Sequence, residues 1–306
     1  MGIFTGVLFA ADFDHTITAM DGSIPEKNLD AIRAFVAEGG VFSVASGRSV
    51  PLFREKARLL PINAPCLLYN GAACYDYREE KFLFQYDMPD DAQEILDGLC
   101  AQFPDVRIEV QTPDTCYAYG DDPMRDAYLR RVGAKFTYAG DAPVPCPWVK
   151  IVVYGKFRRP EYDSVDSITP EDIAYFDRIE AVLRELSRGR ANVARSMGRI
   201  VECWPLGCDK GSSARELARR MGCTVLVGAG DAPNDLPLLN ESDYAFCPAD
   251  CAAALHSGPY RFVAPCGEGA IAAAMEELKK CFCYFISVFC YFYGSNYNWR
   301  CLNLAY

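Results

Sequence analysis

The sequence predicts an α/β protein: a doubly wound, Rossmann-like parallel sheet with an inserted α/β domain. Short apolar runs that suit strands buried on both faces alternate with amphipathic helical stretches near both ends of the chain. The middle of the chain has a different pattern, and 306 residues suffice for two domains of roughly 150 residues each. We expect a core over residues 1–77 and 205–280, an inserted domain over residues 78–204, and an unusual tail over residues 281–306.

The first part of the core begins with an apolar run over residues 7–11, which predicts a buried strand. A capping box at residues 23–26 then starts a helix with one apolar face, and the glycine pair at residues 39–40 ends it. Residues 41–45 and 66–69 are two further apolar runs with another helical stretch between them. Strands that alternate with helices in this way predict a parallel sheet.

The inserted domain combines predicted strands with two amphipathic helices. One helix carries apolar residues from Ala92 to Phe103, and the other follows a capping motif at residues 169–172. The predicted strands cover residues 82–86, 107–111, 115–119, 148–154 and 199–204. The α/β pattern then returns, with helices over residues 210–222 and 269–279 and strands over residues 224–227, 244–246 and 261–263.

The tail holds ten of the 39 aromatic residues and four of the fifteen cysteines, but no acidic residue and a single basic one, Arg300. Its apolar run, residues 281–293, is shorter than the about 20 residues of a membrane-spanning helix. It also lacks the basic face of an interfacial helix. A hydrophobic flap, an interfacial anchor and sequence foreign to the domain all stay open, and we assign the tail no function.

The composition limits the possible classes of function. The chain has 31 Lys and Arg against 41 Asp and Glu, a net charge of −10. This argues against a dedicated nucleic-acid binder, because such proteins neutralise phosphates with basic residues. The apolar start of the chain has no basic segment and runs into acidic residues, so we expect no secretory signal, no membrane partner and a cytoplasmic location. There the cysteines are expected to be reduced packing residues, and the oligomeric state stays open.

Polar clusters directly follow three of the predicted parallel strands, at residues 12–16, 46–48 and 230–235. Ligands of open α/β sheets bind outside the carboxyl ends of the strands, so we expect these clusters to share one site. The carboxylates of that site are Asp12, Asp14, Asp231 and Asp235. They would repel one another without a cation, and their oxygen donors suit Mg²⁺, which in turn attracts phosphate oxygens.

Each cluster also has a simpler interpretation. Asp12 and Asp14 could be turn or cap residues after a strand, and residues 46–48 and 231–235 have ordinary turn compositions. Lys210, near the start of a helix, could be a solvated charge. It is the joint occurrence of the clusters, in this order and at strand ends, that favours a shared site.

The chain resembles the haloacid dehalogenase superfamily of phosphotransferases in four ordered motifs. They are Asp12-Phe13-Asp14-His15-Thr16, Ala45-Ser46-Gly47-Arg48, Lys210-Gly211 and Gly230-Asp231-Ala232-Pro233-Asn234-Asp235. The large inserted domain and two further motifs are similar to the Cof-type branch (subfamily IIB): Asn70-Gly71-Ala72 and Gly267-Glu268-Gly269-Ala270. The resemblance spans about residues 6–280. His15 departs from it, since glycine is commonest at this position in the family.

The resemblance implies a Mg²⁺-dependent phosphatase that hydrolyses a small phosphorylated metabolite, such as a sugar phosphate, through an aspartyl-phosphate. Asp12 would be the nucleophile, and Asp14 the general acid and then the general base. The implied metal ligands are the carboxylates of Asp12 and Asp231, the main-chain carbonyl of Asp14, and Asp235 as ligand or support. The implied substrate-binding residues are Ser46, Gly47, Lys210 and Asn234.

Two other functions stay open. A phosphomutase would transfer the same phosphoryl group to a sugar hydroxyl instead of water, and a non-catalytic protein would only bind phosphorylated metabolites. Specificity is expected to lie in the inserted domain. Its polar candidates are Arg107, Lys150, Arg195 and Ser196, and a solvated surface position is the favoured interpretation for each.

Overall fold

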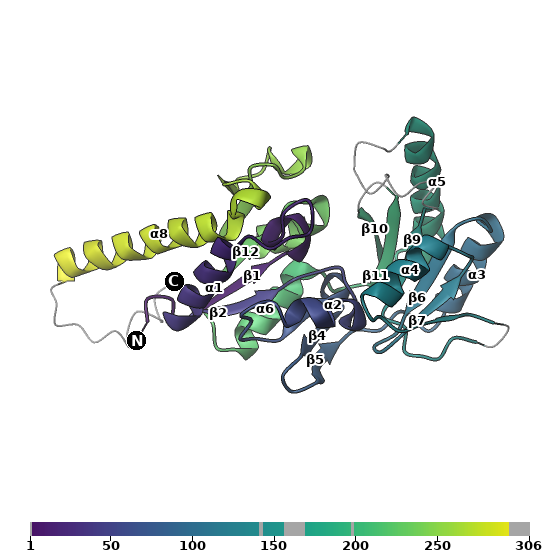
Figure 1. Cartoon of the computed structure of the whole chain (residues 1–306), viewed down its shortest axis with the longest axis horizontal. Coiled ribbons are helices and arrows are strands. Elements are labelled where there is room, and N and C mark those ends of the chain that lie inside the picture. Colours follow the sequence, from purple (N-terminus) through teal and green to yellow (C-terminus); the bar gives the residue numbers. More distant parts are fainter. Residues whose placement is uncertain (1, 141–142, 156–168, 197–198, 294–306) are drawn as a thin grey trace. The chain divides into compact units, whose positions relative to one another are not determined.

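The computed structural model describes residues 2–140, 143–155, 169–196 and 199–293, with side chains up to residue 283. The chain divides into two compact units, which are taken one at a time below (Figure 1). The first unit comprises Met1–Ala45, Leu60–Ala64 and Ala214–Tyr306, and the second comprises Ser46–Leu59 and Pro65–Ser213.

The first unit is built on a fully parallel five-stranded sheet with strand order β14-β13-β12-β1-β2. From β1 and β12 the chain winds outward in both directions, so the sheet is doubly wound, as the sequence predicts. All five residues of β1 are buried, which is why this strand reads as a continuous apolar run. The strands are β1 (Val7–Ala11), β2 (Val41–Val44), β12 (Val225–Ala229), β13 (Tyr244–Pro248) and β14 (Arg261–Val263).

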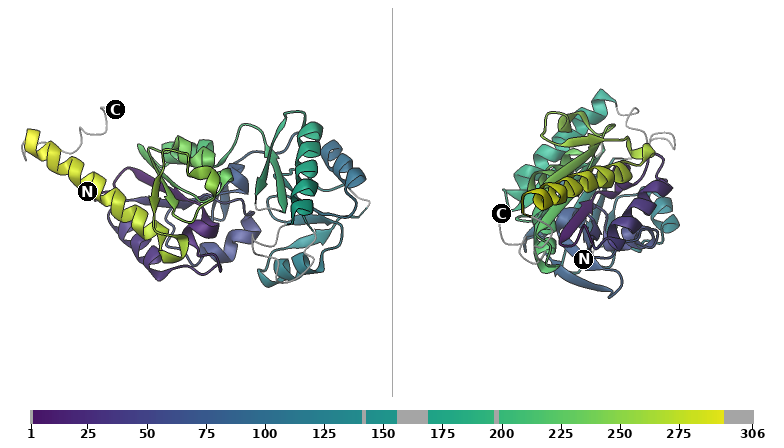
Figure 2. Two further views of the ribbon diagram at one scale, coloured as in Figure 1. Left: turned by 90° about the horizontal axis from the view of Figure 1, so that it is seen from above. Right: turned by 90° about the vertical axis from the view of Figure 1, so that its left-hand side faces the viewer.

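Helices α1 (Glu26–Ala37) and α8 (Ala270–Tyr293) pack against each other in the first unit. The buried side chain of Asn28, on α1, links the turn Phe13–Ile17 to α8. Its nitrogen donates to the Ile17 carbonyl (2.9 Å), and its oxygen accepts from the backbone amide of Ala272 (3.0 Å). Helix α8 continues past the predicted end at residue 279, and Figure 2 shows it projecting beyond the sheet of this unit. Helix α7 (Leu236–Glu241) follows β12, and α6 (Lys210–Arg220) precedes it.

Residues 294–306 of the tail lie outside the described residues. At the start of the tail, the Phe282 ring lies 5.7 Å from the ring of Phe4 and 6.1 Å from that of Tyr244, so this part of α8 packs on the first unit. No helix in the described part of the chain is both long enough and apolar enough to cross a membrane.

The second unit holds a six-stranded sheet with strand order β10-β11-β9-β6-β7-β8, antiparallel except for the β7–β8 pair. Helices α3 (Ala92–Gln102) and α5 (Pro170–Ser187) cover one face of it and form the apolar core of this unit. The strands are β6 (Arg107–Gln111), β7 (Cys116–Tyr119), β8 (Phe136–Tyr138), β9 (Lys150–Tyr154), β10 (Ala191–Ser196) and β11 (Ile200–Pro205). The bounds of an inserted domain over residues 78–204 stay a prediction.

The other face of this sheet is polar yet buried. In β6, Ile108 and Val110 point into the apolar core, while Arg107, Glu109 and Gln111 alternate with them and are equally buried. Helix α4 (Pro123–Arg131) contributes to the cover of this face, since Arg125 binds Glu109 through two hydrogen bonds of 2.9 Å. The sequence does not predict α4, because its residues carry little apolar periodicity.

One strand pairs differently from the prediction. Residues 66–69 are predicted as a further strand of the parallel sheet, but β3 (Cys66–Leu68) pairs antiparallel with β4 (Ala73–Asp76), which pairs with β5 (Lys81–Gln85). The reason is the connection. Only the short turn Tyr69–Gly71 joins β3 to β4, and a connection of that length allows only antiparallel neighbours. Helix α2 (Val50–Ala57) fills the predicted helical stretch before β3.

Most cysteines of the described residues are buried, as expected of packing residues, whereas Cys146 and Cys283 are exposed. Burial raises the pKa of the Cys203 and Cys208 thiols to about 12, and that of Cys266 to about 11. These thiols therefore stay protonated at neutral pH, as suits side chains that fill a core.

Candidate active site

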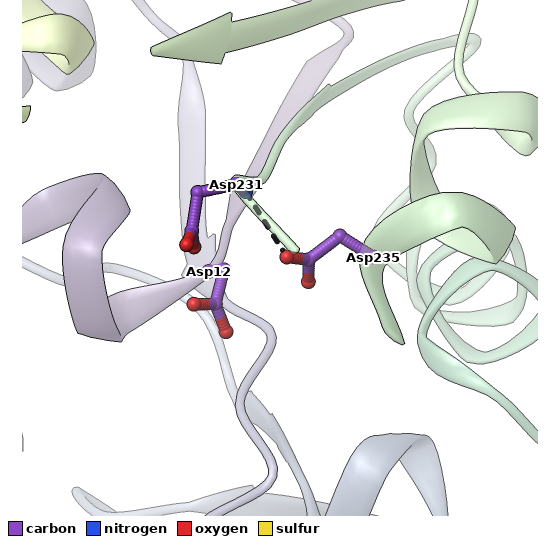
Figure 3. Close-up of side chains that lie close together, drawn as sticks. All are labelled: Asp12, Asp231 and Asp235. Atoms are coloured by element: carbon purple, nitrogen blue, oxygen red, sulfur yellow. Dashed lines mark hydrogen bonds between the residues drawn. The ribbon is translucent and has the colours of Figure 1, made fainter. Parts of the chain in front are cut away.

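Three carboxylates meet at the carboxyl end of the parallel sheet in the first unit. β1 and β12 are neighbours with Ala11 opposite Ala229, so the residues that follow both strands emerge side by side. One oxygen from each of Asp12, Asp231 and Asp235 lies within 4.8 Å of the others (Figure 3). The doubly wound topology therefore brings together side chains that are more than two hundred residues apart in sequence.

The cluster is held by neighbouring groups of the same unit. The Thr16 hydroxyl donates to Asp231 Oδ1 (3.0 Å). Asp235 Oδ2 accepts from the backbone amides of Asp231 (3.1 Å) and Ala232 (3.0 Å), and the side chain of Asp235 is completely buried. Asp12 is 7% exposed, so two of the three carboxylates are almost removed from solvent.

This arrangement fits a hard divalent cation. Buried carboxylates at this separation repel one another strongly, and burial removes the water that would screen them. Carboxylate oxygens are the donors that Mg²⁺ prefers in proteins, and three of them meet here. The residues present therefore fit the predicted metal.

Asp14 is half-buried and lies in the π-helical turn Phe13–Ile17, two residues after Asp12. Its carboxylate is not among the three clustered groups. The next residue, His15, adopts a left-handed conformation (φ 58°, ψ 13°) that glycine adopts without a steric cost. This conformation explains why glycine is commonest at that position in the family. In this chain the backbone amide of His15 donates to the Thr18 hydroxyl (3.0 Å), which helps to hold the turn.

The predicted phosphate-binding residues Ser46, Gly47 and Lys210 fall in the second unit. Ser46 is 1% exposed, and its hydroxyl accepts from the Arg48 amide (3.2 Å). The Ser46 amide donates to the Leu67 carbonyl (2.8 Å). Lys210, at the start of α6, is also 1% exposed, so it is not the solvated charge of the simpler interpretation.

That these residues join the carboxylates of the first unit in one site stays a prediction. The same is true of the contacts predicted for Asn234, which lies half-buried in the turn Pro233–Asp235.

The surface interpretation of Arg107 and Lys150 is wrong. Arg107 is completely buried and Lys150 is 1% exposed, because both lie on the covered polar face of the six-stranded sheet. Lys150 forms a buried ion pair with Glu202, a residue that sequence reasoning missed. The sequence did carry a signal for this pair: Lys150 and Glu202 are each the one charged residue of an otherwise apolar strand.

Comparisons with known proteins agree with this geometry. The sequence profile of the haloacid dehalogenase-like hydrolases matches residues 9–256. A phosphatase named HMP-PP phosphatase, from Escherichia fergusonii, is 24% identical over 249 residues, which are 78% of this chain and 82% of that protein.

Two solved structures show the same fold. A haloacid dehalogenase-like hydrolase from Bacteroides thetaiotaomicron is 19% identical, covers 90% of this chain and 99% of its own, and has a TM-score of 0.74. A sugar phosphatase of subclass IIB is 17% identical, with 89% and 98% coverage and a TM-score of 0.70. With the profile match over most of its length, the chain belongs to the haloacid dehalogenase-like hydrolases, in their Cof-type branch, and is an enzyme of the hydrolase class.

Proposed function

We propose that this hydrolase is a Mg²⁺-dependent phosphatase that acts on a small phosphorylated metabolite through an aspartyl-phosphate. The observation that carries the proposal is the carboxylate cluster of Asp12, Asp231 and Asp235, in which the residue assigned as nucleophile lies beside two acidic groups. One relative is named as an HMP-PP phosphatase and one structural neighbour as a sugar phosphatase. A sugar phosphate is therefore the first substrate class to test.

In the first step a carboxylate oxygen of Asp12 forms a bond to phosphorus while the bond from phosphorus to the substrate oxygen breaks. Asp14 gives its proton to the departing alcohol. In the second step the Asp14 carboxylate takes a proton from water, and the water oxygen attacks the phosphorus of the acyl-phosphate. The bond to Asp12 then breaks, which releases inorganic phosphate and restores both side chains.

The other assigned residues bind and neutralise the phosphoryl group. Ser46 and the Gly47 amide donate hydrogen bonds to its oxygens, Asn234 is a further contact, and Lys210 supplies a positive charge. Mg²⁺, held by Asp12, Asp231, the Asp14 carbonyl and Asp235, would offset the negative charge of nucleophile and substrate. Phosphoryl transfer depends mainly on such positioning and charge compensation.

The test is phosphate release from a panel of phosphorylated metabolites, with and without Mg²⁺, by the intact chain and by Asp12→Asn. We expect release that requires Mg²⁺ and falls by about 10⁴-fold or more in Asp12→Asn, since the amide is a poor nucleophile. Asp30→Asn, which changes an exposed carboxylate in the same unit, is the control and should retain full activity.

Two outcomes would contradict the proposal. Transfer of phosphate between sugar hydroxyls without release would identify a phosphomutase. Binding of the metabolites without turnover of any of them would identify a non-catalytic binding protein.

A further inference from the structure

A buried ion pair lies on the polar face of the six-stranded sheet in the second unit. Lys150 on β9 and Glu202 on β11 come from adjacent antiparallel strands (Figure 1). Glu202 lies opposite Val152, two residues along from Lys150, so the two side chains are diagonal neighbours on one face. Neither charged group reaches solvent to any useful extent, with Lys150 at 1% and Glu202 at 7% exposure.

The ion pair is hydrogen-bonded to two loops that precede the sheet in sequence, one with Gly47 and one with Asn70. Lys150 Nζ donates to the Gly47 carbonyl (2.9 Å) as well as to Glu202 Oε1. The second oxygen of Glu202 accepts from Asn70 Nδ2 (2.9 Å). The backbone amide of Asn70 in turn donates to the Ser46 carbonyl (3.1 Å). A closed chain of contacts therefore surrounds the backbone of Ser46 and Gly47.

The fit at Gly47 is too close for a larger residue. A Cβ at this position would lie 2.7 Å from Asn70 Oδ1 and 3.6 Å from Lys150 Nζ. Asn70 itself is held in a left-handed conformation (φ 60°), as is Tyr69 before it (φ 53°). A non-glycine residue in this region is strained, and it persists only where the surroundings fix it.

Stability alone does not account for these charges. A buried ion pair is often replaceable by apolar side chains at no net cost, because desolvation offsets the attraction. Burial lowers the pKa of Lys150, and the positive charge of Lys210 lowers it further against the attraction of Glu202. Burial would raise the pKa of Glu202, but Lys150 and the hydrogen bonds from Asn70 and Ser196 lower it. The attraction between Lys150 and Glu202 therefore opposes the desolvation that burial imposes on each group.

We propose that Lys150, Glu202 and Asn70 are positioning residues that hold the Ser46–Gly47 loop in the conformation that binds a phosphoryl group. Lys150 acts through the Gly47 carbonyl, Glu202 fixes Lys150, and Asn70 holds both Glu202 and the Ser46 carbonyl. The inference rests on the proposed function, in which Ser46 and Gly47 contact the phosphoryl oxygens.

The experiment compares two double variants that each remove one buried ion pair. Lys150→Met/Glu202→Gln removes the pair bound to Gly47. The matched control, Arg107→Met/Asp126→Asn, removes an ion pair (3.0 Å) that is similarly buried, and whose Arg107 likewise donates to a backbone carbonyl, that of Gly120 (3.0 Å). Arg107 lies opposite Tyr154, at the other end of β9 from Lys150.

Calorimetry measures the binding of inorganic phosphate in the presence of Mg²⁺. Each of the three backgrounds (wild type, Lys150→Met/Glu202→Gln and the control) is measured with Ser46 intact and with Ser46→Ala. In the wild-type background we expect Ser46→Ala to weaken binding by about tenfold. In the Lys150→Met/Glu202→Gln background it should weaken binding by less than about threefold, because the loop is already displaced. In the control background the full tenfold effect should remain. A merely structural pair would leave the effect of Ser46→Ala the same in all three.

Hydrolysis of p-nitrophenyl phosphate by the wild type, run in parallel, separates this inference from the proposed function. Phosphate binding without hydrolysis would overturn the proposed function. The inference would still be tested by comparing the effect of Ser46→Ala on phosphate binding in the three backgrounds. A tenfold Ser46→Ala effect that persists without the ion pair would overturn the inference alone. A wild type that neither binds phosphate nor hydrolyses p-nitrophenyl phosphate would overturn both.

If Lys150→Met/Glu202→Gln does not fold, Glu202→Gln alone replaces it, since that variant keeps the shape of the side chain and removes only its charge. In the Glu202→Gln background, too, we expect Ser46→Ala to weaken phosphate binding less than it does in the wild type. If hydrolysis is observed, kcat/KM for p-nitrophenyl phosphate should fall by about 10–100-fold in Lys150→Met/Glu202→Gln. It should change by less than about threefold in the control.

Discussion

Asp235 differs from the other two carboxylates of the cluster in its surroundings. Its Oδ2 accepts two backbone amides from the loop that carries Asp231, and it is completely buried. The side chain therefore shapes the loop whether or not a cation is bound.

This difference predicts distinct results for two variants of Asp235. Asp235→Ala should lower the free energy of unfolding by about 1–3 kcal/mol, because two buried amides lose their acceptor. Asp235→Asn retains an oxygen acceptor and should lose less stability, while its Mg²⁺ affinity falls by about 10–100-fold. Thermal unfolding in EDTA and calorimetric titration with Mg²⁺ measure the two effects separately. Unchanged Mg²⁺ affinity in Asp235→Asn would show that Asp235 only supports the loop.

Sequence reasoning works unevenly at this scale. Asp12, Asp231 and Asp235 follow buried strands, and the parallel topology alone indicates that they meet. Lys150 and Arg107 also lie in strands, but the strand pattern shows only that a side chain points to one face or the other. Whether that face is open or covered depends on α4 and the loops, which the local pattern does not specify.

Among the elements, the turn Tyr69–Gly71 connects more of the second unit than its length suggests. Its Asn70 contacts the Ser46–Gly47 loop, and the Gly71 carbonyl accepts from the Ser213 hydroxyl on α6 (2.7 Å). Gly71 has φ 94°, and a Cβ there would lie 2.2 Å from the Asp209 carbonyl oxygen. Only glycine allows the turn to approach the start of α6 this closely.

We therefore expect Gly71→Ala to lower the free energy of unfolding by about 2–4 kcal/mol, through backbone strain and overlap with Asp209. Gly22→Ala is the matched control: Gly22 has a similar φ of 80°, but no atom lies within 4 Å of a Cβ built there. It should cost about 1 kcal/mol, from backbone conformation alone. Urea unfolding of the three proteins checks this, and equal losses in the two variants would mean that the contact with Asp209 is unimportant.

The short connection at Tyr69–Gly71 also explains why one strand was assigned to the wrong sheet. The apolar composition of residues 66–69 predicts a buried strand correctly, but it contains no information on pairing partners. Pairing follows from loop length, and the strand-forming character of β4 is weak in the sequence. Boundaries of α3, α5 and β11, in contrast, are close to prediction because capping residues and long apolar stripes define them.

For the molecule as a whole, acid should weaken folding through Asp172, at the start of α5. Burial alone would raise the pKa of this carboxyl, but hydrogen bonds from Arg199 and Thr169 lower it to about 2. A carboxyl with a lowered pKa in the folded state stabilises folding above its unfolded pKa near 4, and this contribution is lost as the pH falls towards 2.

Asp172→Asn should therefore lower the free energy of unfolding by about 1–2 kcal/mol at pH 7, with the difference from wild type closing between pH 4 and pH 2. Asp177→Asn, on the same helix, is the control. Its ion pair with Arg195 is 3.0 Å long, but Asp177 is 63% exposed, so little effect is expected. Urea unfolding across this pH range is the measurement. A constant difference at all pH values would rule out a contribution from ionisation.

Family membership and the doubly wound sheet were predictable from the sequence, because four motifs at strand ends and a regular strand–helix alternation carry both. The second unit was less predictable. Its sheet depends on pairings between distant strands, and its buried charges depend on a cover that only the folded chain provides. The same long-range character explains why the sequence does not reveal which leaving group this enzyme accepts.

The hydrogen bond from Lys150 to Gly47 has a consequence for protein engineering. A chimaera that exchanges only residues 78–204 between two relatives would take the two partners of this bond from different proteins, since residue 47 would come from one parent and residue 150 from the other. The lysine position of one parent would then face the Gly47 position of the other. Recombination should therefore transfer residues 46–59 together with residues 65–213, so that Gly47 and Lys150 come from the same parent.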